Sequence, residues 1–256
     1  MNDPATQLPQ ERFRARCPIC DQVREFVCND DFWWCRDGMV APECELYGCV
    51  TRERAIASAI LSIFDRDVLC TLTIHEAAPV MRGLTLWMSR ECPGYLRSGY
   101  FPDRPFGDMI EGVRNEDLEH QTFADETFDL VVHLDVMEHL FDPFQALREI
   151  ERTLKPDGWC IFTAPTEKEM FESQQVAFQE ADGLRIVGEP EYHGNPQRPE
   201  DGALVTWRYG YDLPLLIQRQ TGFDVETRRY QSRDIAAMGY KNEVYLLRKS
   251  RHARLR

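Results

Sequence analysis

Cysteine residues are concentrated at the N-terminal end of the chain, where their spacing is typical of metal binding. Of the nine cysteines, six fall within the first 50 residues. Cys17 and Cys20 form a C-x2-C pair, which lets two thiolates approach one tetrahedral ion from a tight turn. Cys44 and Cys49 lie about as far downstream as a second pair should, so the sequence predicts a structural zinc site with these four thiolate ligands.

The second half of this zinc knuckle is less regular than the first. Residues 41–44 (A-P-E-C) resemble a C-P-x-C whose first cysteine is replaced by alanine, so either Cys49, Cys35 or Cys28 completes the ligand shell, or the site is incomplete. Two further interpretations stay open: a knuckle that packing holds together without metal, and a redox-active thiol site. A closed four-thiolate site has no open coordination position, so we expect it to act as scaffold rather than as reaction centre.

Hydrophobic patterns predict the elements that position the remaining polar residues. The segment 128–164 is the clearest, with a strand, a helix that begins after Asp142-Pro143, and a second strand from Trp159. Such a βαβ unit predicts an α/β fold with a mostly parallel sheet and helices on both faces. We also expect helices over 55–64, 79–88 and 211–222, and strands over 68–74, 223–229 and 243–247.

These elements divide the chain into two parts. Residues 1–54 form the cysteine-rich module, and residues 55–256 form the α/β domain. Residues 166–209 are long and polar, which is typical of a lid inserted into a compact domain. Because ligands of open parallel sheets bind outside the carboxyl ends of the strands, candidate site residues follow the predicted strands, in segments 74–78, 97–100, 115–118, 133–135 and 164–166.

At these positions the sequence resembles a known family. The class I S-adenosylmethionine-dependent methyltransferases of the type 11 group are similar to this chain in segments 117–118, 123–132, 135–140, 147–150 and 154–158. The C-P-x-C pair, R-E-R-A at 52–55 and E-Y-H-G-N-P at 191–196 resemble a subgroup that joins a zinc knuckle to this domain. The resemblance implies a Rossmann-like methyltransferase sheet and S-adenosylmethionine as cofactor.

The resemblance also implies roles for individual residues. Asp117 would accept a hydrogen bond from the adenine amine, as a carboxylate offers only lone pairs, and Leu118 would pack on the ring. The turn after the first strand and the end of the strand over 128–133 would line the rest of the cofactor, which adds Glu76, Ala77, Ala78, His133, Leu134 and Asp135 to the expected cofactor site.

Two features of the family are missing from this sequence. Most members have a glycine-rich turn after the first strand, whereas here Ala77 and Ala78 are followed by proline and the next glycine is Gly83. The acidic residue that holds the ribose hydroxyls is replaced by Gly99, and either Glu76 or Asp103 could substitute for it.

Histidines supply the expected acid–base chemistry. In methyl transfer the sulfonium is already a good leaving group, so the protein positions the acceptor and, where needed, removes its proton. Histidine is the natural base near neutral pH, and we expect His193 in this role, with His139 as the second candidate and His133 as the third. Tyr192, beside His193, is expected to contribute to the acceptor site.

Charge and hydropathy restrict the partners. The net charge of −13, from 30 basic and 43 acidic residues, opposes nonspecific binding to nucleic acid, and we expect a small-molecule substrate. An RNA methyltransferase is the first alternative and predicts a basic face from residues 12–24 and 52–54; an inactive Rossmann-like binding module is the second. No apolar run reaches 18 residues and no signal core is present, so we expect a cytoplasmic protein without membrane contact.

Overall fold

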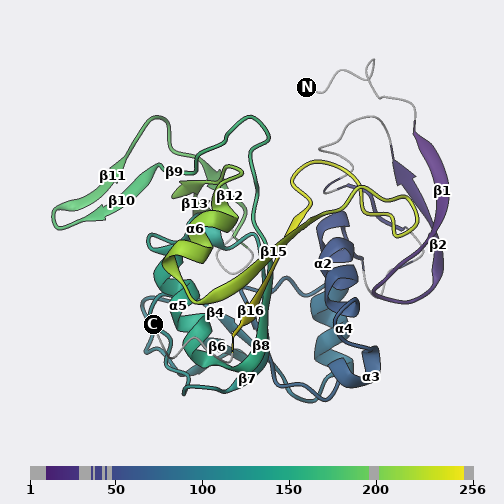
Figure 1. Ribbon diagram of the computed structural model, residues 1–256, viewed down its shortest axis with the longest axis horizontal. Helices are drawn as coiled ribbons and strands as arrows, with labels where there is room; N and C mark the ends of the chain where they lie inside the picture. The colour runs from purple at the N-terminus through teal and green to yellow at the C-terminus, as the bar shows by residue number, and fades with distance from the viewer. Residues whose placement is uncertain are drawn as a thin grey trace.

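A central sheet organises the molecule (Figure 1). The computed structural model describes residues 10–28, 36, 38–41, 44, 48–195 and 202–250, and among these residues eight strands form one sheet in the order β15-β16-β8-β7-β3-β4-β6-β5. The strands are β3 (Ile74–Ala77), β4 (Tyr95–Gly99), β5 (Met109–Ile110), β6 (Val113–Asn115), β7 (Phe128–Leu134), β8 (Leu154–Thr163), β15 (Phe223–Arg229) and β16 (Glu243–Lys249). The helices are α2 (Thr51–Leu61), α3 (Arg66–Leu69), α4 (Gly83–Glu91), η2 (Met137–His139), α5 (Pro143–Thr153) and α6 (Leu213–Gln220).

Strand order reverses at β3. This strand pairs in parallel with both β4 and β7, and β7 pairs in parallel with β8. The chain moves outward from β3 through β4 to β6 and then returns to the other side of β3 with β7. The carboxyl ends of these strands therefore open onto the crevice where open α/β sheets bind ligands. The predicted mostly parallel sheet is confirmed, and β16 is an antiparallel strand between β8 and β15.

Both faces of the sheet are covered by helices. Alternate residues of β7 face opposite sides, as the pleat of a strand requires. Leu130 and Val132 pack in one hydrophobic cluster with Ile56 of α2, whereas Val131 packs in a second cluster with Leu147 of α5. Figure 1 shows α2 and α4 on one side of the sheet and α5 and α6 on the other. A strand buried on both faces explains the continuous apolar run that the sequence shows there.

The β7–α5–β8 unit confirms the most specific prediction of secondary structure. The Asp142 carboxylate accepts a hydrogen bond of 2.8 Å from the backbone nitrogen of Gln145, and Pro143 occupies the first helical turn. The helix ends at Thr153 and β8 begins at Leu154, earlier than the strand start predicted at Trp159. The pairing of β8 with β7 shifts register between Phe128 and Leu130, where residues 155–158 intervene.

The predicted strand over 68–74 is also wrong. Residues 66–69 form the one-turn helix α3, and the strand begins only at Ile74, the first residue that pairs with both β4 and β7. A short apolar run fits a buried helical turn as well as a buried strand, and in this segment Leu69 packs inward while Val68 is 47% exposed.

The segment 166–209 folds into short hairpins over the carboxyl edge of the sheet. Its strands are β9 (Gln174–Gln175), β10 (Ala177–Glu180), β11 (Gly183–Ile186), β12 (Tyr192–His193), β13 (Ala203–Leu204) and β14 (Trp207–Arg208). β10 pairs with β11, β12 with β13, and β14 with β9. The β10–β11 hairpin projects away from the sheet (Figure 1), whereas β12 and β13 return to it.

The N-terminal module packs directly on α2. Its hairpin consists of β1 (Glu11–Arg16) and β2 (Val23–Cys28), and Phe26 and Met39 belong to the same hydrophobic cluster as the buried face of α2. The cysteine-rich segment and the α/β domain therefore share one core. No described helix is long and apolar enough to cross a membrane.

Candidate active site

A cavity of about 1290 Å³ opens at the carboxyl edge of the sheet. It runs from the ends of β3, β4, β6 and β7, past η2, to the underside of the β12–β13 hairpin. Of the expected cofactor residues, six line it: Ala77, Ala78, Asp117, Leu118, Leu134 and Asp135. The position after a strand was thus a sound guide to most of this wall.

The turn after β3 keeps a conformation that favours glycine although it contains none. Ala78 has φ +50°, in the left-handed region, and its backbone nitrogen donates a hydrogen bond of 2.9 Å to the Ser98 carbonyl oxygen. Alanine tolerates this conformation at a cost of about 1–2 kcal/mol. Gly83 serves another purpose, because a Cβ there would overlap the Glu53 carboxylate where α2 meets α4. The turn after β3 therefore keeps its backbone conformation although alanine stands where most of the family has glycine.

Two of the expected cofactor residues, Glu76 and His133, do not line the cavity, contrary to the expectation from sequence. Glu76 is buried behind β3, where its carboxylate accepts hydrogen bonds of 2.7 Å from Thr85 Oγ1 and the Tyr95 hydroxyl. Burial raises the pKa of Glu76 to about 7. His133 is fully buried and stacks on Phe162 with ring centroids 4.6 Å apart, and burial lowers its pKa to about 3, so it is neutral. Both side chains point into the interior because the strand pleat turns them away from the edge.

The loop after β6 holds Asp117 and Leu118 at the cavity. Asp117 accepts a hydrogen bond of 2.9 Å from the backbone nitrogen of Glu119, which fixes the turn, and its side chain is 24% exposed. Leu118 packs against Ala77. The end of β4 carries Gly99, and neither Glu76 nor Asp103 lines the cavity in its place.

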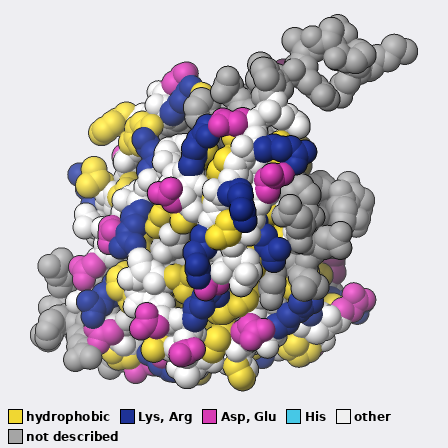
Figure 2. All heavy atoms as spheres, turned by 90° about the vertical axis from the view of Figure 1, so that its right-hand side faces the viewer, with side chains coloured by type: hydrophobic (Ala, Val, Ile, Leu, Met, Phe, Trp, Pro, Cys, Tyr) yellow, Lys and Arg dark blue, Asp and Glu magenta, His cyan; other side chains and the backbone are white. Residues whose placement is uncertain are grey.

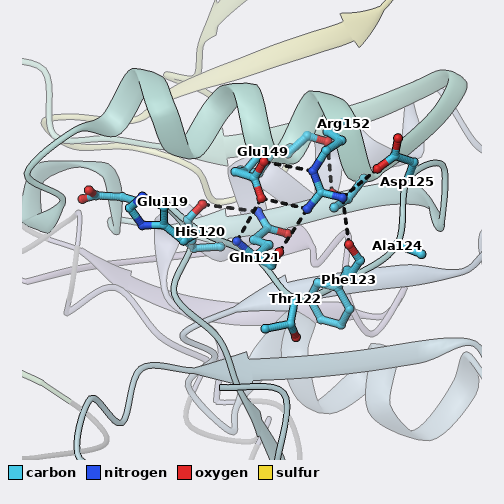
Figure 3. A network of polar contacts seen from close by, with 12 residues as sticks. Glu119, His120, Gln121, Thr122, Phe123, Ala124, Asp125, Glu149 and Arg152 are labelled. Atoms are coloured by element: carbon cyan, nitrogen blue, oxygen red, sulfur yellow. Dashed lines mark hydrogen bonds and ion pairs between the residues drawn. The ribbon is translucent and has the colours of Figure 1, made fainter. Parts of the chain in front are cut away.

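A polar network behind this loop explains the charged residues of α5 that the family motif contains (Figure 3). Arg152 donates to the Phe123 carbonyl oxygen at 2.8 Å and to the Gln121 carbonyl oxygen at 3.1 Å. It also binds the Glu149 carboxylate, which accepts a hydrogen bond from the backbone nitrogen of Gln121. The network ties residues 121–125 to α5 and so fixes the loop whose first part lines the cavity.

Asp135 connects the α/β domain to the N-terminal module. It has φ +53° and accepts a hydrogen bond of 2.8 Å from Thr163 Oγ1. Its carboxylate lies 2.5 Å from Arg36 Nη2 and 3.3 Å from Arg52 Nε. Burial opposes ionisation of Asp135, but the two guanidinium groups prevail and hold its pKa at about 2. Sequence reasoning missed both arginines as cavity residues, although R-E-R-A was part of the family motif.

Two of the expected catalytic residues meet at the lid side of the cavity. His139 Nε2 and His193 Nδ1 each lie 3.7 Å from Glu138 Oε1, and all three residues line the cavity. Another, Tyr192, is 56% exposed and does not line the cavity, because neighbouring residues of a strand point to opposite faces. Glu138 is the group that sequence reasoning undervalued. Its position directly before His139 was the only signal.

The four cysteines predicted as ligands come together beneath the N-terminal hairpin. Cys17 Sγ lies 3.6 Å from Cys49 Sγ, and the Cys20 thiol is within hydrogen-bonding reach of Cys17 and Cys44. Arg54, whose side chain is fully buried, donates to the Cys49 carbonyl oxygen at 2.6 Å and approaches its sulfur at 3.4 Å. The Cys17 thiol and this guanidinium hold the pKa of Cys49 below its ordinary value.

The other two candidate ligands are not equivalent. Cys28 lies at the end of β2 in the hydrophobic cluster, and Cys35 lies outside the described residues.

Comparison with known proteins bears on this site directly. Residues 103–162 match the family model described as a methyltransferase domain. The matched segment runs from the loop before β5 to β8 and includes the loop after β6, the end of β7 and η2, which together form about a third of the cavity wall. The chain is an S-adenosylmethionine-dependent methyltransferase.

Solved structures similar to this methyltransferase share little sequence with it. One is an S-adenosylmethionine-dependent methyltransferase from Mesorhizobium loti, with 16% identity and a TM-score of 0.49, covering 76% of this chain and 97% of that one. Another is the 1,6-didemethyltoxoflavin-N1-methyltransferase of Burkholderia thailandensis with bound 1,6-didemethyltoxoflavin and S-adenosylhomocysteine, with 16% identity and a TM-score of 0.45, covering 78% of each chain. No curated protein matches the sequence.

Proposed function

We propose that this methyltransferase transfers the methyl group of S-adenosylmethionine to an oxygen or nitrogen atom of a small molecule, such as a sugar or a secondary metabolite. One observation carries the proposal. A single cavity joins the ends of the parallel strands to the buried carboxylate and two histidines of the Glu138–His139–His193 cluster. Cofactor and acceptor can therefore meet within one cavity, as a displacement reaction requires.

The residues at the strand ends fit the cofactor. Asp117 offers a carboxylate to the adenine amine and Leu118 offers an apolar surface to the ring, while the left-handed turn at Ala78 leaves the edge of β3 free of larger side chains. Arg36 and Arg52 line the cavity beside Asp135 and suit the carboxylate of the methionine part.

Proton removal from the acceptor is assigned to the Glu138–His139–His193 cluster. As the methyl group leaves the sulfonium sulfur, the acceptor atom forms a bond to its carbon, and S-adenosylhomocysteine is the second product. A hydroxyl or protonated amine must give up its proton before or during this step. Glu138 raises the pKa of His193 above its ordinary value, and the His193 ring is 38% exposed toward the cavity side of the lid.

Charge favours a small molecule over RNA. On the lid side of the cavity Lys241 pairs with Glu167 and Arg208 pairs with Glu191, so these cations are not free to bind a phosphate backbone. The basic face that an RNA substrate would need is interrupted. Arg16 pairs with Asp21, and Arg54 is buried. Figure 2 shows acidic side chains distributed among the basic ones on the face over the N-terminal hairpin.

The cofactor assignment is tested by calorimetry with S-adenosylmethionine and S-adenosylhomocysteine. We expect the wild type to bind both, and Asp117→Ala to bind them at least about tenfold more weakly, the loss expected for a hydrogen bond to a charged group. Asp182→Asn, an exposed carboxylate on the β10–β11 hairpin, is the matched control and should bind like the wild type. No binding by the wild type would favour the alternative of an inactive binding module. Unchanged affinity in Asp117→Ala would remove the adenine assignment.

The acceptor class requires a separate measurement. Release of S-adenosylhomocysteine is followed with a panel of hydroxylated and amino small molecules and, in parallel, with structured RNA. Turnover with small molecules and none with RNA is the expected result. Turnover with RNA alone would overturn the small-molecule assignment while leaving the methyltransferase activity in place.

We also propose that Cys17, Cys20, Cys44 and Cys49 hold a structural zinc ion. Thiolates are the ligands that zinc prefers in such sites, and a buried guanidinium needs a negative partner, which a zinc-bound thiolate at Cys49 gives to Arg54. Metal analysis of the purified protein tests this directly. About one zinc per chain is expected, and less than half an equivalent would count against the site.

A further inference from the structure

The Glu138–His139–His193 cluster has a feature that methyl transfer alone does not require. One ligand atom from each residue lies within 4.8 Å of the other two. The Glu138 side chain is 1% exposed, and neither of its carboxylate oxygens has a hydrogen-bond partner among the described residues. A buried carboxylate without hydrogen bonds is costly, and proteins pair such a group with a cation.

Hydrogen bonds on the far side of each ring orient both imidazoles toward this carboxylate. His139 Nδ1 lies 2.8 Å from the Leu204 carbonyl oxygen, which can only accept, so this nitrogen carries the hydrogen and Nε2 presents its lone pair to Glu138. His193 Nε2 lies 3.3 Å from Glu191 Oε1, a carboxylate oxygen to which it can donate, so Nδ1 is available to bind a cation beside Glu138. Metal-ligating histidines are held in this manner, with the second nitrogen donating to a carbonyl or a carboxylate.

We propose that Glu138, His139 and His193 bind a divalent transition-metal cation at the acceptor end of the cavity. A single proton between Glu138 and one ring would satisfy one lone pair, whereas one cation satisfies both imidazole nitrogens and the carboxylate together. Two imidazoles and a carboxylate favour first-row ions such as Mn²⁺, Fe²⁺, Co²⁺ or Zn²⁺ over Mg²⁺ and Ca²⁺, which prefer oxygen ligands.

This inference deepens the proposed function and rests on it for the identity of the substrate. Three protein ligands leave open positions on the ion, facing the cavity. An acceptor with two neighbouring oxygens, such as a vicinal diol, a catechol or a 2-hydroxy acid, can occupy two of them. Coordination makes the acceptor hydroxyl more acidic, its proton passes to solvent, and the resulting oxygen anion takes the methyl group from the sulfonium. In this arrangement the cluster still brings about loss of the acceptor proton, but it acts through the bound cation, with the histidines as its ligands.

The proposal is tested with Mn²⁺, read by electron paramagnetic resonance on full-length protein that holds no more than one equivalent of zinc, which the four thiolates take in preference to the histidine cluster. Mn²⁺ prefers oxygen and nitrogen ligands to thiolates, so it reports on this cluster rather than on the N-terminal one. We expect one bound Mn²⁺ per chain, and affinity at least tenfold weaker in both Glu138→Gln and His193→Ala. Glu172→Gln, an exposed carboxylate of the same segment, removes one negative charge elsewhere and should bind like the wild type.

Two outcomes overturn the proposal: no stoichiometric Mn²⁺ in the wild type, or equal affinity in the wild type and Glu138→Gln. Circular dichroism checks that each variant is folded. Because Glu138→Gln keeps the volume of the side chain, a loss of Mn²⁺ affinity in this variant cannot come from a packing defect. Calorimetry with S-adenosylhomocysteine separates this test from the proposed function. If the wild type binds S-adenosylhomocysteine but not Mn²⁺, the cation proposal is rejected and the proposed methyltransferase function stands. If the wild type does not bind S-adenosylhomocysteine, the proposed function is rejected whether or not Mn²⁺ binds.

Discussion

Replacing Asp135 by asparagine tests whether the N-terminal module is held to the catalytic domain by charge. In the wild type the Asp135 carboxylate faces the guanidinium groups of Arg36 and Arg52, and its side chain is only 16% exposed. Asparagine keeps the shape of the side chain and removes the negative charge. The two guanidinium groups then lose their common partner in a place from which water is largely excluded, which destabilises the folded state.

The pKa of Asp135 gives the size of the effect. It falls from 3.8 to about 2 in the folded protein. Since one pKa unit corresponds to about 1.4 kcal/mol, ionised Asp135 contributes about 2–3 kcal/mol of stability. A depressed carboxyl pKa means that the unfolded chain binds the proton more readily. The contribution is therefore complete above about pH 5 and falls as the pH drops through 4 toward 2, with about 1 kcal/mol lost by pH 3.

Urea unfolding of the wild type and Asp135→Asn at several pH values between 7 and 3 measures this contribution. We expect Asp135→Asn to be about 2–3 kcal/mol less stable at pH 7, and the difference to shrink by about 1 kcal/mol at pH 3. Asp182→Asn should stay within about 0.5 kcal/mol of the wild type throughout, as most exposed substitutions do. A difference that is the same at pH 7 and pH 3 would refute the ion-pair reasoning, because a purely steric effect has no such pH dependence.

Three further predictions concern the zinc site, the turn after β3 and a buried carboxylate. Cys17→Ser should lose its zinc and unfold at markedly lower temperature than the wild type, and chelators should then have no further effect; an unchanged zinc content would contradict the ligand assignment. Ala78→Gly should bind S-adenosylhomocysteine like the wild type. Ala78→Val, with a branched side chain at positive φ, should bind it at least about tenfold more weakly and lose about 1–3 kcal/mol of stability. Equal affinities of Ala78→Val and the wild type would show that the turn does not contact the cofactor. Because burial raises the pKa of Glu76 to about 7, the wild type should lose up to about 3 kcal/mol relative to Glu76→Gln as the pH rises from about 4.5 to 8; parallel stability curves for the two proteins would argue against this cause.

The sequence predicted the β7–α5–β8 unit well because the features that determine it, a helix cap and the spacing of apolar residues, lie within a few residues of one another. The cap at Asp142, the proline after it and the spacing of Leu147 and Ile150 each act within one or two helical turns. The segment 66–74 was predicted less well, because its apolar run suits either a strand or a buried turn, and the pairing partners that decide are distant in sequence. Ile74 becomes the first strand residue only because Tyr95 and Leu130 lie beside it.

The cavity wall was predictable to the extent that topology places strand ends at one edge. Ala77, Asp117 and Asp135 follow from this rule. The direction of a side chain does not follow from it, and for that reason Glu76 and His133 were assigned to the cofactor although the strand pleat turns both into the interior. Arg36 could not have been found from sequence at all, since its place in the wall depends on how a distant segment packs against α2.

The ion pairs at Asp135 and the shared core beneath the N-terminal hairpin also determine how this enzyme can be divided. A chain cut before α2 would lose Arg36 from the cavity wall and expose the apolar face on which Phe26 and Met39 rest. Such a fragment would resemble a minimal methyltransferase in sequence length but would lack part of its own binding surface. Exchange of this module between related enzymes should therefore succeed only when the arginines and their carboxylate partner are inherited together.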